Sequence, residues 1–187
     1  HEDVPSPVIY QGFTPVEPLI KAIITSKNRF PVLWSIIFRR ELLTDVLDIP
    51  REIIEGEDKL MQVKVLMKQP KVFFIPQLVY CYTLGVPNSR RHTLEREQLY
   101  DQLLLQTLGQ HATDYADALT LHKLKEYERF IYDGVYTVRK AYYEFAIGKP
   151  SSAIPLYDRL VFALPPVLAR PVIKLYRTFI NIKQKGL

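Results

Sequence analysis

The feature that most constrains the fold is a helical repeat of apolar residues over residues 114–147. Apolar side chains recur there at steps of three and four positions, so they fall on one face of a helix. They are Leu121, Leu124, Ile131, Val135, Val138, Tyr142 and Phe145. Gly148 and Pro150 follow and predict the end of this helix. A last helical pair is predicted over about 155–184, divided at Pro165–Pro166.

Three further helices are predicted in the first part of the chain. A short helix is expected over 16–26, and a longer one over 94–108. An amphipathic helix is expected over about 57–69, because an apolar stripe recurs there at helical spacing while polar side chains point away. The stripe consists of Leu60, Val63, Leu66 and Met67, and the polar side chains are Lys59, Gln62 and Lys64.

Short extended segments are predicted between these helices. The alternating apolar residues Val32, Trp34, Ile36 and Phe38 are typical of an extended segment packed on a core, and a helical turn follows over 40–47. The runs KVFFI (71–75) and LVYCYTL (78–84) are rich in β-forming residues. The chain is therefore predicted to be α+β and predominantly helical, with a mixed part over 1–112 and a helical part over 113–187.

Composition excludes several classes of protein. Hydrophobic residues make up 48% of the chain and charged residues 24%, which is the balance of a folded protein. No apolar run is long enough to cross a bilayer. The net charge is +5, but no nucleic-acid-reading module accompanies it, so nucleic acid is not an expected partner. The single cysteine, Cys81, and the scattered histidines predict a reducing, cytoplasmic location and no metal site in this chain.

Two adjacent carboxylates, Glu57 and Asp58, follow Gly56 at the predicted start of the helix over 57–69. One interpretation is structural, because acids in a first turn interact favourably with the helix dipole by ~0.3–1 kcal/mol each. The other is catalytic, because a carboxylate held rigidly beside a cleft can act as a general base. The pair itself leaves both interpretations open.

The order of several short motifs resembles the C-terminal half of family 2 glycosyltransferases of the GT-A type. In bacterial members that build surface polysaccharides, a tryptophan precedes an aromatic-Arg-Arg-Glu-Leu run. A proline-led segment ending in Glu-Asp, a Tyr-x-Tyr strand and a Pro-x-Ser loop then follow. The matching elements here are Trp34, Phe38–Leu42, Pro50, Glu57–Asp58, Tyr80–Tyr82 and Pro87–Ser89. The resemblance covers about residues 15–92.

The resemblance implies an inverting transfer of a sugar from a nucleotide-sugar donor. Asp58 matches the position of the catalytic base, which would deprotonate an acceptor hydroxyl, and Glu57 would orient the loop or the acceptor. Trp34 would line the acceptor side, although an ordinary core aromatic is the alternative for this residue. The acceptor would be a saccharide or a lipid-linked saccharide.

Further residues in the region of the resemblance are expected to bind substrate. They are Arg39, Arg40, Tyr82, Ser89, Arg90 and Arg91. The last two belong, with His92, to a basic loop that could stabilise the charge of a leaving nucleoside diphosphate. A solvated basic loop without a ligand is the alternative.

A GT-A enzyme also needs a nucleotide-binding half with a paired-aspartate motif that holds a divalent cation, Mg²⁺ or Mn²⁺. No strand leading to such a motif is visible here, and the chain begins at His1 without an initiator methionine. We therefore expect the sequence to be the second half of a larger enzyme, and to transfer no sugar by itself.

The C-terminal region is basic and amphipathic. From Arg159 onward there are six Lys or Arg residues and no Asp or Glu, with apolar and aromatic residues between them. Such a segment, here 155–187, could lie on an anionic membrane surface, which would make the protein peripheral at the inner face of the membrane. It could equally be a core-packing helix pair with a solvated charged face. The rival to an enzyme is therefore a non-enzymatic helical module that docks to a membrane or a protein partner.

Overall fold

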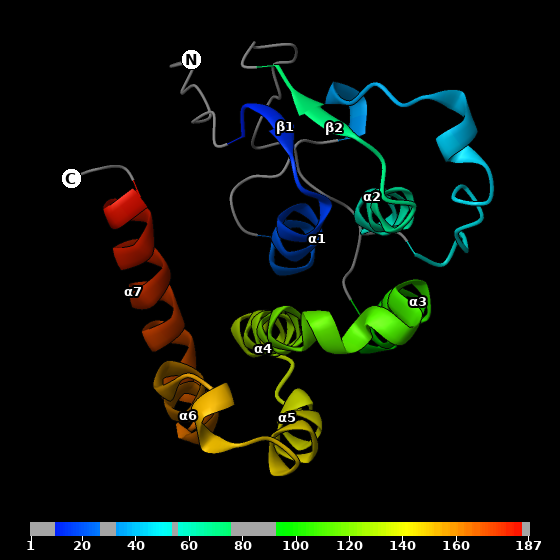
Figure 1. Ribbon diagram of the computed structural model, residues 1–187. Helices are drawn as coiled ribbons and strands as arrows, with labels where there is room; N and C mark the ends of the chain where they lie inside the picture. The colour runs from blue at the N-terminus through cyan, green and yellow to red at the C-terminus, as the bar shows by residue number, and fades with distance from the viewer. Residues whose placement is uncertain (1–9, 27–32, 54–55, 76–92, 185–187) are drawn as a thin grey trace. The chain divides into compact units, whose positions relative to one another are not determined.

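The structure is a computed structural model that describes residues 10–26, 33–53, 56–75 and 93–184 (Figure 1). It is predominantly helical and has one two-stranded sheet in the described part, so the predicted α+β class is confirmed. The chain divides into two compact units, His1–Ala116 and Asp117–Leu187, and each unit is described by itself.

Helix α2, Glu57–Met67, lies at the centre of the first unit between α1, Val16–Thr25, and α3, Leu94–Leu108 (Figure 1). All three helices were predicted from apolar periodicity, and all three are confirmed. The burial of α2 is wider than a single stripe, because neighbours cover it on more than one side. Gln62 was predicted to point away from the core, but it is buried, so that prediction is wrong. The buried residues of α2 are Leu60, Met61, Gln62, Val63, Val65 and Leu66.

The sheet of the first unit joins two segments far apart in the sequence. Strand β1, Gly12–Thr14, pairs antiparallel with β2, Val72–Phe74, and Phe13 lies opposite Phe73. The prediction of a strand within 71–75 is confirmed, whereas the strand at β1 was not predicted. The predicted strand over 78–84 lies outside the described residues.

Residues 33–53 run along α2 as an irregular segment. The expected extended run is wrong at Leu33–Ser35, which form a 3₁₀ turn, and the predicted helix over 40–47 is reduced to a 3₁₀ turn at Arg40–Leu43. Val46 is buried against Met61 and Val65 of α2. Apolar burial of this kind fixes the segment without any sheet partner.

Lys64 of α2 and Lys68, directly after α2, hold this segment by hydrogen bonds to its backbone. The Nζ of Lys64 donates to the carbonyl oxygen of Asp48 at 2.8 Å. The Nζ of Lys68 donates to the carbonyl oxygens of Leu42 and Thr44. These bonds satisfy carbonyl groups that have no strand or helix partner.

The second unit contains α5, Val138–Ile147, α6, Leu156–Ala163, and α7, Pro166–Gln184; α4, Ala116–Tyr132, begins at the boundary. The predicted single helix over 114–147 is wrong, because α4 ends before Gly134, which has φ +87°. That backbone conformation suits glycine and breaks the helix. The predicted helical pair over 155–184 is confirmed.

The core of the second unit is rich in aromatic side chains. Tyr142 of α5 stacks on Phe162 of α6 with ring centroids 3.7 Å apart, and Tyr127 of α4 meets both rings edge to face. Tyr143 donates to the carbonyl oxygen of Phe162 at 3.1 Å, and Arg139 donates to that of Leu164. These donors satisfy carbonyl groups at the end of α6.

None of the helices in the described part of the chain combines the length and the apolar character that crossing a membrane requires.

Candidate functional site

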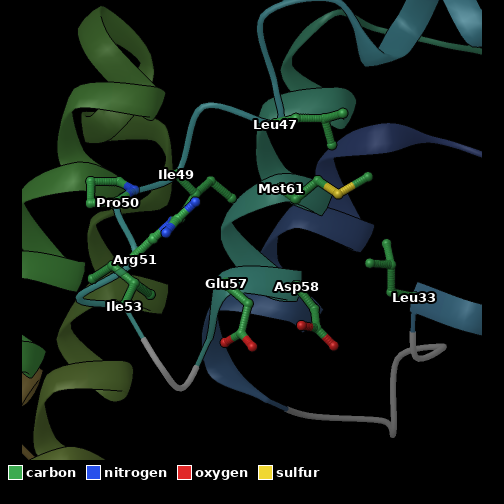
Figure 2. Close-up of a pocket in the computed structure, with 9 residues that line it drawn as sticks. All are labelled: Leu33, Leu47, Ile49, Pro50, Arg51, Ile53, Glu57, Asp58 and Met61. Atoms are coloured by element: carbon green, nitrogen blue, oxygen red, sulfur yellow. The ribbon is translucent and has the colours of Figure 1, made fainter.

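A pocket of about 310 Å³ opens at the start of α2 in the first unit (Figure 2). Most of its lining is apolar, and three charged side chains complete it. The lining residues are Leu33, Leu47, Ile49, Pro50, Arg51, Ile53, Glu57, Asp58 and Met61. A concave apolar surface with a few polar groups is the usual form of a small-molecule site.

Gly56 fixes the start of α2. It has φ +93°, and a Cβ atom placed on it would lie 2.8 Å from the Cε2 atom of the Tyr100 ring. Tyr100 belongs to α3 and is buried, so the ring has little room to move away. Both the backbone conformation and the close approach require glycine, and together they set where the next two residues stand.

Glu57 and Asp58 occupy the first turn of α2, and both side chains are partly buried. Figure 2 shows the two carboxylates projecting from this turn on the same side. No described residue forms a hydrogen bond or ion pair with the Asp58 carboxylate. Its oxygens are therefore available to accept a proton or a hydrogen bond from a ligand hydroxyl.

Of the other predicted substrate residues, the structure places one, Trp34, next to a residue that lines this pocket. Trp34 lies in the 3₁₀ turn that also carries the lining residue Leu33. Arg39 and Arg40 are exposed and do not line the pocket. The remaining predicted residues lie outside the described residues; they are Tyr82, Ser89, Arg90 and Arg91.

Arg51 is a pocket residue that the motif argument missed. It lies between the lining residues Pro50 and Ile53, on the exposed rim, and adds five N–H donors to a pocket that also holds two acids. The only signal in the sequence was its position directly after Pro50, within the same proline-led segment. In the described residues, no group of three His, Cys, Asp or Glu side chains could hold a metal ion.

A second polar cluster lies inside the second unit. Arg177 of α7 contacts Glu128 of α4, with Nε and Nη2 both 2.9 Å from one carboxylate oxygen. Asp158 in the first turn of α6 is buried near Glu128. Burial, followed by repulsion from Glu128, raises the pKa of Asp158 from 3.8 to about 6. Burial also raises the pKa of Tyr157. The contact between Arg177 and Glu128 ties α7 to α4, so we assign this cluster a structural role.

The raised pKa of Asp158 predicts a pH-dependent stability of the second unit. The unfolded chain loses this proton near pH 3.8 and the folded chain near pH 6, so folding is progressively disfavoured between these values and by a constant amount above them. Asp158→Asn should therefore raise the free energy of unfolding, measured with urea, by about 3 kcal/mol at most at pH 8. At pH 4 the same substitution should raise it very little. The exposed Asp133→Asn is the control. A gain of the same size at both pH values would contradict this assignment.

Comparison with protein-family models gives no match for this chain, and none of the curated proteins or solved structures matches it. The resemblance to family 2 glycosyltransferases therefore stays a prediction that rests on the motifs.

Proposed function

We propose that the pocket at the start of α2 is the acceptor site of an inverting, nucleotide-sugar-dependent glycosyltransferase of cell-surface polysaccharide assembly. The observation that supports this most is the position of Asp58. Its carboxylate lines a largely apolar pocket, is held by a buried helix, and has no partner in the described part of the chain.

The chemistry of sugar transfer gives Asp58 a defined role. A sugar hydroxyl is a weak nucleophile, and a general base within hydrogen-bond reach makes it competent. The hydroxyl oxygen forms a bond to the anomeric carbon of the donor, and the bond from that carbon to the diphosphate oxygen breaks. The hydroxyl proton passes to Asp58, and the nucleoside diphosphate leaves with the bonding electron pair. Attack opposite the leaving group inverts the anomeric centre.

The rest of the lining suits a saccharide. Apolar side chains such as Ile49 and Met61 can pack against the C–H face of a sugar ring. The guanidinium of Arg51 can donate hydrogen bonds to the hydroxyls of a sugar ring, and the carboxylate of Glu57 can accept them. Glu57 would orient the acceptor while Asp58 takes the proton.

The proposal assigns donor binding and the divalent cation to a nucleotide-binding half outside residues 1–187. When bound, Mg²⁺ or Mn²⁺ would neutralise the charge of the leaving diphosphate. The described residues offer no set of ligands for this ion, so no step here is assigned to it. We also propose that the protein is cytoplasmic and peripheral at the inner face of the membrane, where nucleotide-sugar donors and lipid-linked acceptors meet.

The test is an assay of the product of the whole reading frame that contains these residues. Purified protein is incubated with a panel of nucleotide sugars, divalent cation and membrane extract, and nucleoside diphosphate release and saccharide products are measured. We expect release with at least one donor, and none from residues 1–187 alone. No sugar transfer with any donor would contradict the proposal.

A further inference from the structure

Helix α7, labelled in Figure 1, carries three groups of side chains that differ in their burial and charge. One group attaches the helix to the second unit through Ala169 and Ile173, which are fully buried, and through the contact of Arg177 with Glu128. Tyr176 adds a ring stacked on Tyr157 of α6 at 3.7 Å. The orientation of α7 in its unit is therefore fixed.

The second group is apolar and exposed. Leu168, Leu175 and Phe179 are separated by seven and four residues, which places them on one side of the helix. Their side chains are 52%, 71% and 64% exposed. An aligned row of large apolar side chains costs free energy in water and indicates a binding surface rather than scattered exposure.

The third group is cationic. Arg170 and Lys174, four residues apart, are both exposed, and the Arg170 guanidinium lies over the Tyr132 ring of α4, 5.5 Å from the ring centroid, where it keeps its charge. Arg177 is already neutralised by Glu128, so the uncompensated positive charge of the described α7 side chains comes from Lys174 and Arg170. No acid follows Asp158 in the sequence, and nothing on α7 offsets this positive charge.

We propose that the apolar row and the cationic side chains of α7 bind an anionic lipid surface. In this orientation Leu168, Leu175 and Phe179 enter the boundary between headgroups and acyl chains, and Lys174 meets anionic headgroups. Arg170, which lies over the Tyr132 ring, adds to the positive charge of the helix. A second copy of the chain is disfavoured, because two cationic helices would repel. This inference rests on α7 alone and stands whether or not the pocket of the first unit is an acceptor site.

The test is flotation of the intact protein with vesicles. We compare vesicles of pure phosphatidylcholine with vesicles that contain about a quarter phosphatidylglycerol, at low and high salt. We expect binding to the anionic vesicles only, and weaker binding at high salt because surface charge is screened. The variant Leu175→Ser/Phe179→Ser should lower the partition coefficient by roughly tenfold or more, and Lys174→Gln by roughly fivefold.

Two controls separate lipid binding from other outcomes. Ile147→Ser removes an apolar side chain of α5 that is 84% exposed and lies outside the apolar row of α7, so this variant should bind as the parent does. Thermal unfolding should be unchanged in all variants, because the substituted side chains are exposed. Equal binding to neutral and anionic vesicles, or an equal loss in Ile147→Ser, would overturn the proposal. Self-association or binding to an acidic protein that the α7 variants abolish, without vesicle binding, would also overturn it.

Discussion

Asp58→Asn is expected to lower kcat for sugar transfer in the full-length protein by ~10²–10⁴-fold, which is the usual contribution of a general base. The amide keeps the size of the side chain but cannot accept a proton at neutral pH. The effect on the free energy of unfolding should stay within ~1 kcal/mol, the usual contribution of an acid in a first turn. The measurement is the steady-state rate of nucleoside diphosphate release, together with a urea unfolding curve.

The matched control is Glu95→Gln in α3. Glu95 is the second residue of its helix, as Asp58 is of α2, but it is not one of the pocket-lining residues. It should lose a similar small amount of stability and no turnover. If both variants keep full activity, the acid pair only starts a helix and the catalytic interpretation is wrong.

Gly56→Ala is expected to destabilise the first unit by about 3 kcal/mol, the largest loss of stability that we predict. A β-carbon at φ +93° is strained, and it would also meet the buried ring of Tyr100 at 2.8 Å. Relief of this contact requires movement of α2 relative to α3. We therefore also expect the start of α2, and with it the carboxylate of Asp58, to shift. The measurement is chemical unfolding, followed in the full-length protein by the transfer rate.

Gly12→Ala is the matched control for backbone strain alone. Gly12 also has a positive φ, +71°, but a β-carbon there would meet no atom within 4 Å. Its cost should be about 1–2 kcal/mol, with no effect on transfer. Equal costs for the two variants would show that the Tyr100 contact does not position α2.

Local apolar periodicity was enough to predict the helices of the first unit, because each has its own apolar repeat and is followed by residues that end a helix. The same rule failed over 114–147, where the repeat continues in phase through the turn at Gly134. Gln62 was wrongly assigned to the surface for a related reason. A single stripe assumes one buried face, whereas α2 is covered on more than one side.

The candidate site, too, could be predicted from the sequence only in part. The position of Glu57 and Asp58 at a helix start was predictable, because it depends on neighbouring residues alone. The pocket around them depends on how residues 33–53 run along α2, which no local pattern specifies. Leu33 and Arg51 join the site only through this arrangement. The pairing of β1 with β2, between segments about 60 residues apart, was missed for the same reason.

The most direct test of the acceptor pocket uses the two methionines of the chain. Met61 lines the pocket, whereas Met67 ends the same helix outside it, so the second methyl group is an internal control. Methyl-labelled protein is titrated with saccharides that serve as acceptors in the full-length transfer assay, and both methyl signals are followed by NMR. We predict a saturable shift of Met61, weakened by Asp58→Asn, with Met67 unmoved. An unshifted Met61 at saccharide concentrations that saturate transfer would contradict the assignment of this pocket as the acceptor site.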